Sequence, residues 1–293
     1  MKKLLYSRRI SSKILRKKKI LMSLINTDWL LENSNNVKII DSSWHLPNQN
    51  RNAEKEYSNE HIINSIFFDI DKNSDQETDL PHMLPSVKKW EGIVSNLGIS
   101  NDDKIIIYDN SDLISSCRCW FTFIYFGHDP SLISVLNGGL KKWKQERKPT
   151  VNSVTKVNQS RYKAKENKKM VKSKIEIDTN INLKNFKVVD ARNLDRFEGK
   201  VPEPRSNVRS GSIEGSTCLP FNQIINKNDN TFKNKDDLIK IFNKILNTQH
   251  NNIVFSCGSG ITASVLALAY SLINTKYTPT IYDGSWSEYG LIK

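Results

Sequence analysis

A cysteine near the end of the sequence lies where a nucleophilic thiol is expected. Residues 252–256 (NIVFS) form a short apolar run typical of a buried strand, residues 257–260 (CGSG) follow as a tight loop, and residues 261–272 predict an apolar helix. The free N–H groups and the dipole of a helix N-terminus favour an anion, and consecutive loop N–H groups form a concave site for one. This setting suits a thiolate at Cys257. On the local pattern alone, an inert buried cysteine is an equal alternative.

The spacing around this loop argues against several other chemistries. A cysteine phosphatase needs an arginine six positions after the cysteine to hold phosphate oxygens, and that position is Ala263. The sequence has no Walker lysine and no Gly-x-Gly-x-x-Gly stretch, so nucleotide binding is weakly supported. Cys117 and Cys119 lack a second cysteine or histidine pair nearby, which argues against zinc. We expect these two cysteines to be packing residues of a helix.

Length and charge limit the class of protein. The 293 residues suffice for two ordinary domains, and a hydrophobic content of 38% supports real cores. The net charge is +13, but residues 1–20 hold nine lysines and arginines and no acid, so the remaining chain carries only +4. A basic tail on a nearly balanced body argues against nucleic-acid binding. No apolar run is long enough to span a membrane, and four cysteines without framework spacing indicate a reducing compartment.

The basic tail allows two interpretations. It contains serine and no acid, as a mitochondrial presequence does, and it equally fits a disordered bacterial extension. Abundant lysine, asparagine and isoleucine in the rest of the chain favour the bacterial interpretation. We therefore expect a cytoplasmic protein, with the mitochondrial matrix as the alternative. Met22 offers a second natural start of the chain.

The two halves of the sequence repeat the same order of segments. Three pairs of matching positions are separated by 149, 151 and 148 residues: Asp41 and Asp190, His61 and Ser212, and Asp109 and Cys257. Such self-similarity predicts two copies of one domain, and alternating strands and helices predict a mainly parallel sheet flanked by helices in each. The first copy is expected to be inactive, because an aspartate stands where the second copy has its cysteine.

The predicted organisation has four parts. Residues 1–22 form the tail, 23–146 the inactive domain, 147–174 a polar linker, and 175–293 the catalytic domain. With one copy inert and the other catalytic, we expect the active site to lie at the junction of the two domains.

Several motifs in the same order make the chain resemble the rhodanese-like sulfurtransferases with two tandem domains. The resemblance runs from about residue 24 to the end, and it is strongest in the members that use 3-mercaptopyruvate, whose signature CGSG[VI]TA matches residues 257–263. The thiosulfate-using members instead place basic residues after the cysteine. The other matching segments are Phe67–Asp71, His82–Pro85, Asn137–Leu140 with Trp143, Asp190–Arg192, Arg196 with Phe197, Pro202–Arg205 and Tyr282–Trp286.

The resemblance implies a reaction in two steps. The Cys257 thiolate takes the sulfur of 3-mercaptopyruvate as a persulfide, and pyruvate leaves as its enolate and picks up a proton. Thioredoxin, a small thiol or cyanide then accepts the outer sulfur, so one transfer is split into two easier steps. The loop N–H groups are expected to hold the substrate sulfur or the persulfide anion. The resemblance also assigns four residues of this segment to substrate binding: Gly258, Gly260, Ile261 and Thr262.

The resemblance also assigns substrate and proton-transfer residues. Arg196 and Arg205 correspond to the family's substrate arginines, and planar guanidinium groups suit a 2-oxo acid. Asp71, His82 and Ser259 correspond to a proposed charge relay, in which a histidine held by a carboxylate moves protons near neutral pH. Alternatively, Ser259 caps the helix that follows. Surface arginines and a structural turn histidine are the plain alternatives.

The chain departs from the family pattern in the second domain. Residues 211–215 read GSIEG where the family has Gly-His-Ile-Pro-Gly, and we expect this turn to affect stability rather than catalysis. Arg192 is expected to be structural and paired to an acid. The resemblance implies no metal and no organic cofactor. Two rival functions stay open: a thiosulfate sulfurtransferase and a non-catalytic rhodanese-like binding module. No role is predicted for Cys218.

Overall fold

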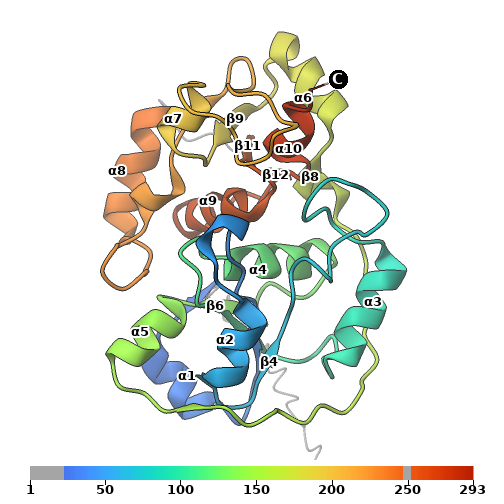
Figure 1. The fold of residues 1–293 in the computed structure, drawn as a ribbon, viewed down its shortest axis with the longest axis vertical. Coiled ribbons are helices and arrows are strands. Elements are labelled where there is room, and N and C mark those ends of the chain that lie inside the picture. The colour runs from blue at the N-terminus through green and yellow to red at the C-terminus, as the bar shows by residue number, and fades with distance from the viewer. Residues whose placement is uncertain (1–22, 247–251, 293) are drawn as a thin grey trace, which may run out of the picture.

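The computed structural model describes residues 23–246 and 252–292. These residues form two α/β domains, the N-terminal one in the lower half of Figure 1 and the C-terminal one in the upper half. The basic tail, on which the predictions about targeting rest, lies outside the described residues. Among the described residues, no helix combines the length and the apolar character that crossing a membrane requires.

The first domain is built on a parallel sheet of five strands in the order β1-β6-β5-β2-β4. Its central strands β2 and β5 are aliphatic and almost wholly buried, as expected for a sheet with helices on both faces. The strands are β1 Leu24–Ile25, β2 Lys38–Asp41, β4 Ser65–Phe67, β5 Ile105–Tyr108 and β6 Ile133–Leu136. A separate antiparallel pair joins β3 (His61–Ile62) to β7 (Thr150–Val151).

The second domain repeats this topology. Its five parallel strands have the order β8-β12-β11-β9-β10, so that β11 takes the place of β5 and β9 that of β2. The strands are β8 Val171–Lys172, β9 Lys187–Asp190, β10 Thr217–Cys218, β11 Ile253–Ser256 and β12 Ile281–Tyr282. The prediction of two α/β copies with parallel sheets is thus confirmed.

The helices fill the crossovers between these parallel strands. The first domain has α1 Thr27–Asn33, α2 Ala53–Asn59, α3 Val87–Asn96, α4 Ser116–Tyr125 and α5 Gly139–Gln145; the second has α6 Lys174–Leu183, α7 Leu194–Phe197, α8 Lys235–Leu246, α9 Ile261–Ile273 and α10 Ser285–Tyr289. Three short 3₁₀ turns, Pro47–Gln49, Lys168–Met170 and Phe221–Ile224, complete the described elements.

Helix α9 lies at the centre of the molecule. It packs on its own sheet and on α4 of the first domain, and the two helices lie against each other between the domains in Figure 1. A helix covered on both sides must be apolar all round, which explains the sequence ITASVLALAYSLI. The helix after the cysteine loop therefore forms much of the domain interface, and the loop itself lies at that junction.

Local interactions set several boundaries of the elements. Helix α4 begins at Ser116, whose N–H donates to the Asp109 carboxylate at 2.9 Å. Strand β6 ends at Leu136, and Gly138 and Gly139 then adopt positive φ angles at the start of α5. The segment predicted as a linker, 147–174, contains β7 and also β8, an edge strand of the second sheet.

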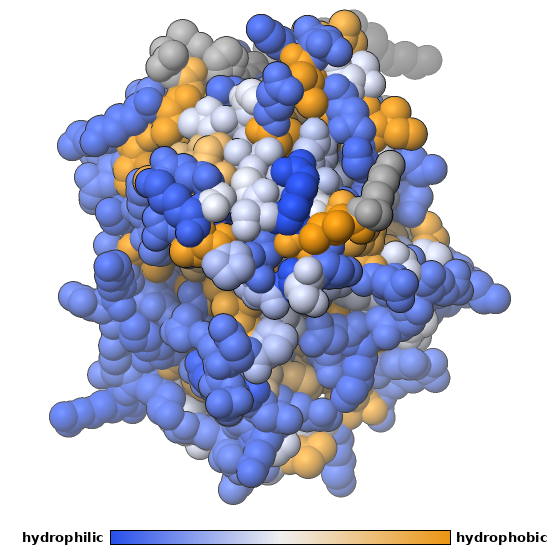
Figure 2. Space-filling model, turned by 45° about the horizontal axis from the view of Figure 1, so that its top comes forward, coloured by the Kyte–Doolittle hydropathy of each residue, from blue (hydrophilic) through white to orange (hydrophobic). Residues whose placement is uncertain are grey.

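The surface carries the polar residues that the composition requires. On the face shown in Figure 2, hydrophilic side chains cover most of the surface, and apolar residues form small separate groups between them. The large aromatic and aliphatic side chains are buried between the sheets and helices, with one cluster extending across both domains. Because this core continues across α4 and α9, the domain junction is a packed interface that can hold two halves of a site in register.

Candidate active site

Cys257 directly follows β11, at the carboxyl edge of the second sheet, where open α/β folds place their ligands. Strand β11 is buried and is paired on one side with β9 and on the other with β12, so the sheet fixes the position of the cysteine. Cys257 is only 2% exposed. Its Sγ accepts a hydrogen bond from the Gly260 N–H at 3.1 Å. The loop therefore folds back over its own sulfur.

Helix α10 sets the direction of the loop peptides. The carbonyls of Cys257 and Gly258 accept hydrogen bonds from the N–H groups of Trp286 at 2.9 Å and Ser287 at 2.8 Å. In a trans peptide the C=O and the following N–H point in opposite directions, so the N–H groups of Gly258 and Ser259 point away from α10. Together with the Gly260 N–H on Sγ, they give the loop a concave, N–H-lined face that suits an anionic sulfur.

Gly260 is required by its surroundings, and Gly258 has a guanidinium close to its backbone. Gly260 has φ +84°, and a Cβ there would lie 2.8 Å from Nη1 of Arg118. A Cβ on Gly258 would lie 3.4 Å from Nη2 of Arg196. The absence of side chains therefore lets two guanidinium groups approach the loop backbone closely, one from each domain. The neutral loop gains its positive surroundings from distant segments rather than from its own sequence.

The structure brings Ser259, His82 and Asp71 together across the domain junction. Oγ of Ser259 lies 2.8 Å from Nδ1 of His82, and Nε2 of His82 lies 2.9 Å from Oδ1 of Asp71. Ser259 does not cap α9: the N-cap residue is Gly260, and no side chain caps the helix there. A neutral His82 ring satisfies both partners when Nε2–H donates to Asp71 and Nδ1 accepts from the Ser259 hydroxyl. The chain of contacts can therefore move a proton between the loop and the carboxylate.

Burial and neighbouring charges set the protonation states of His82 and Asp71. Burial lowers the pKa of His82, the Asp71 carboxylate only partly offsets this, and the charges of Arg118 and Arg205 lower it further. His82 is thus a neutral acceptor at pH 7. Burial alone would raise the pKa of Asp71, but the contacts with His82 and Trp44 hold it below its usual range. The indole Nε1 of Trp44 donates to both carboxylate oxygens, at 3.0 and 2.9 Å.

Arg196 is held by a buried glutamate. Its Nη2 and Nε lie 2.5 and 3.2 Å from the two carboxylate oxygens of Glu203. The same carboxylate accepts from Nη1 of Arg192 at 2.8 Å, and Arg192 also makes a forked contact with Asp190. Arg192 is thus paired to acids and almost fully buried, as expected of a structural residue. Glu203 connects this structural pair to Arg196 and fixes its guanidinium beside Gly258.

Arg205 is half-buried near the same loop. Burial and the charge of Arg196 lower its pKa, while the charges of Cys257, Glu203 and Asp71 act in the opposite direction. Arginine remains protonated at neutral pH despite such lowering. Arg205 is therefore a cation within electrostatic reach of the cysteine, as an anionic substrate would need.

The remaining cysteines have a different environment. Cys117 and Cys119 are buried in α4, and burial raises the pKa of both thiols. Cys218 is half-buried, and burial raises its pKa to about 12. These thiols stay protonated at neutral pH, which is the state of packing cysteines rather than of nucleophiles.

Several residues at the site were not predicted. Trp44 holds Asp71, Glu203 holds Arg196, and the Ser285 hydroxyl accepts from the Cys257 N–H at 3.2 Å. Glu203 lies in the matching segment Pro202–Arg205, so only its role was missed. Arg118 gave no signal in the sequence, because its helix reads as a packing helix.

Comparisons with known proteins agree with this geometry. The model of the rhodanese-like domain matches residues 26–146 and again 173–291. The thiosulfate/3-mercaptopyruvate sulfurtransferase 1, mitochondrial, of Arabidopsis thaliana is 34% identical over 91% of this chain and 75% of its own length. The 3-mercaptopyruvate sulfurtransferase of Mus musculus is 33% identical over 91% of each chain. The crystal structure of SseA from Escherichia coli, a 3-mercaptopyruvate sulfotransferase, superposes with a TM-score of 0.80 at 30% identity over 90% of this chain and 99% of its own. This chain therefore belongs to the rhodanese-like domain family.

Proposed function

We propose that the protein is a 3-mercaptopyruvate sulfurtransferase that works through a persulfide on Cys257. The observation that carries the proposal is a neutral cysteine loop approached by arginines from another segment. Arg196 lies against Gly258, and Arg205 acts electrostatically on Cys257. This places positive charge for a substrate carboxylate and keto oxygen beside the sulfur, while the loop N–H groups are left for the transferred sulfur.

The first half-reaction moves one sulfur atom and one proton. The Cys257 thiolate attacks the substrate sulfur, a S–S bond forms, and the C–S bond breaks with its electron pair remaining on carbon. The proton of the substrate thiol leaves sulfur, and one proton reaches the carbon of the enolate to give pyruvate. Ser259, in contact with His82, is the group placed to transfer that proton. Charges and atoms balance, and Cys257 is left as an anionic persulfide.

The second half-reaction returns Cys257 to a thiolate. An acceptor thiol, from a small molecule or a protein such as thioredoxin, or cyanide, attacks the outer sulfur and removes it. Residues 23–146 act as the non-catalytic domain that supplies Asp71 and His82, and residues 175–293 carry the cysteine, with residues 147–174 between them. We further propose a cytoplasmic location, with the mitochondrial matrix as the alternative.

The test is the intact mass of the protein before and after brief exposure to 3-mercaptopyruvate, with pyruvate measured in the same sample. Wild type is expected to gain the mass of one sulfur atom and to release pyruvate. Cys257→Ser is expected to do neither, and Cys218→Ser, at a half-buried cysteine, serves as the matched control and should behave as wild type. A mass gain that persists in Cys257→Ser would assign the sulfur to another thiol and overturn the proposal.

The rival functions give different results in the same experiment. A thiosulfate sulfurtransferase would gain sulfur from thiosulfate much faster than from 3-mercaptopyruvate. A non-catalytic binding module would gain sulfur from neither donor. The two-donor name of the Arabidopsis relative makes thiosulfate the second donor to measure.

A further inference from the structure

Arg118 is a buried cation of the first domain that lies against the cysteine loop of the second. It is the third residue of α4 and is only 3% exposed. Such a charge is costly to bury unless it is paired, so its partners indicate what it does. The polar partners of its guanidinium are the His82 carbonyl and the Asp283 carboxylate.

One nitrogen of Arg118 joins the two domains. Nη2 donates to the backbone carbonyl of His82 and, at 2.7 Å, to Oδ1 of Asp283. Asp283 follows β12 in the second domain, and its Oδ2 accepts the N–H of Leu84 at 2.9 Å. The Arg118–Asp283 pair therefore binds the segment 82–84 at two points, the carbonyl of His82 and the N–H of Leu84. That segment needs holding, because His82 has φ +62°, an unfavourable backbone angle for a residue with a side chain.

The other nitrogen faces the loop. A Cβ on Gly260 would lie 2.8 Å from Nη1 and 3.3 Å from Cζ, so the guanidinium lies directly over the backbone of this residue. Nη1 has no hydrogen-bond partner within the described part of the chain. Gly260 is the residue whose N–H donates to Sγ of Cys257. One side chain thus touches the histidine of the relay and the peptide that bonds the nucleophile.

We propose that Arg118 is a positioning residue of the sulfur-transfer reaction, which fixes His82 and the Cys257 loop relative to each other across the domain junction. The inference rests on the proposed function of the same site. The guanidinium of Arg118 contacts the backbone of the relay histidine and lies over the backbone of Gly260, so we expect this residue to affect kcat rather than KM.

The charge of Arg118 has a second effect, on His82. Asp71 contacts the imidazole directly, Arg118 and Arg205 are the nearby cations, and Trp44 packs edge-on against the ring at 4.7 Å. Of these, the two arginines lower the pKa of His82 and Asp71 raises it. Removal of the Arg118 charge therefore raises the pKa of His82. If the reaction needs neutral His82, the acid limb of the pH–rate profile then moves to higher pH.

The experiment compares Arg118→Gln, Arg118→Lys and wild type by steady-state kinetics with 3-mercaptopyruvate from pH 5 to pH 8. Arg118→Gln is expected to lower kcat at least tenfold, to change KM by less than about twofold, and to shift the acid limb of the profile upward. Arg118→Lys keeps the charge without the fork, so kcat falls while the acid limb stays in place. Arg161→Gln, at an exposed arginine, is the matched control and should retain wild-type kinetics.

A second readout does not depend on the donor. The pKa of His82, followed by NMR and assigned with His82→Asn, should rise in Arg118→Gln and not in Arg161→Gln. If wild type releases no pyruvate, the proposed function fails, while this titration still tests the contact of Arg118 with His82. Wild-type kcat and an unshifted profile in folded Arg118→Gln would overturn the inference. A loss of kcat in parallel with a loss of folded protein, with no change in the His82 titration, would show a purely structural role and also overturn it.

Discussion

The two domains place different chemistry at the same point of the same fold. Cys257 directly follows strand β11, and its sulfur accepts a hydrogen bond from the N–H of Gly260. Asp109 directly follows strand β5, and its carboxylate accepts hydrogen bonds from the N–H groups of Ser111 and Ser116, each at 2.9 Å. In the first domain, the start of the helix is thus neutralised by a side chain of the chain itself. A catalytic loop requires that these N–H groups remain directed at a reactive atom. In the first domain they are instead bound by the carboxylate of Asp109.

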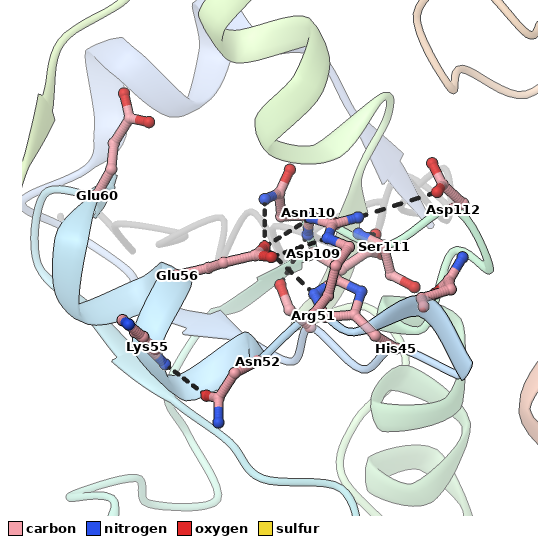
Figure 3. Close-up of polar contacts among 12 residues, drawn as sticks. His45, Arg51, Asn52, Lys55, Glu56, Glu60, Asp109, Asn110, Ser111 and Asp112 are labelled. Carbon is pink, nitrogen blue, oxygen red and sulfur yellow. Dashed lines mark hydrogen bonds and ion pairs between the residues drawn. The ribbon is translucent and has the colours of Figure 1, made fainter. Parts of the chain in front are cut away.

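The surroundings of the two loops differ in the same sense. Figure 3 shows hydrogen bonds and ion pairs among the side chains around Asp109, a region that we call the mouth of the first domain; the mouth of the second domain is the region around Cys257. Arg51 makes a forked contact with Glu56 at 2.6 and 2.8 Å and also donates to the carbonyl of Asn110. The Asn110 amide donates to the same glutamate at 2.9 Å. In the second domain, Arg196 also has a glutamate partner, but it lies against the bare backbone of Gly258. The first mouth stabilises its domain, and the second leaves cations beside a nucleophile.

The largest difference in kcat/KM is expected between substitutions of the arginines at the two mouths. Arg196→Lys and Arg205→Lys each remove a planar fork beside Cys257, and each should lower kcat/KM for 3-mercaptopyruvate by about 100-fold, as expected for the loss of charge-assisted hydrogen bonds to a carboxylate. Arg51→Lys makes the same exchange at the first mouth and should leave kcat/KM within about twofold of wild type. Initial rates of pyruvate release measure all three.

The outcome decides where the substrate binds. If Arg51→Lys lost activity as Arg196→Lys does, while the protein stayed folded, the first mouth would have a catalytic role and the contrast between the domains would be wrong. Wild-type kcat/KM in both Arg196→Lys and Arg205→Lys would remove the arginines from the substrate site.

A smaller effect is expected from the residues that the first domain contributes to the second. Asp71 orients His82 and raises its pKa, so Asp71→Asn should lower kcat by about tenfold and shift the acid limb of the rate profile to lower pH. This shift is opposite in sign to that expected for Arg118→Gln. Asp69→Asn is the matched control, because Asp69 lies two residues away and contacts Lys72 instead. An unchanged profile in Asp71→Asn would mean that His82 does not titrate in the rate-limiting step.

The sequence predicted much of this arrangement because it repeats itself. The repeated order of strands was sufficient to predict two parallel sheets. The glycine-rich loop after one of these strands was sufficient to predict Cys257 at the end of a strand. The motifs of the family are short and local, so the resemblance was sufficient to assign Arg196, Arg205 and Ser259 to the predicted site. Contacts across the junction have no such local signal. Arg118 lies in a run of buried residues, and only the packing of α4 on α9 places it over Gly260.

The last difference between the domains concerns stability and not catalysis. The acids at the ends of β2 and β9, Asp41 and Asp190, are both buried, but they have different partners. Asp190 is paired with the guanidinium of Arg192. No ion pair is found for Asp41 in the described part of the chain; its Oδ1 accepts the N–H and hydroxyl of Ser43, at 2.9 and 2.5 Å, and Tyr108 is a further hydrogen-bond partner. Burial therefore raises the pKa of Asp41 to about 6.

Asp41→Asn should change how stability depends on pH while kcat stays at the wild-type value. Between about pH 4 and pH 6, the unfolded chain has lost the Asp41 proton and the folded chain retains it, so wild-type stability falls as the pH rises through this window. Asparagine does not ionise and keeps the oxygen that Ser43 contacts. The free energy of unfolding of Asp41→Asn, relative to wild type, should therefore increase by about 2.5 kcal/mol from pH 4 to pH 7 in urea titrations. Asp79→Asn, at an exposed carboxyl, corrects for the loss of one charge. A difference that stays constant with pH would show that Asp41 is ionised in the folded protein, and that the first domain tolerates a buried acid without the arginine that the second domain uses.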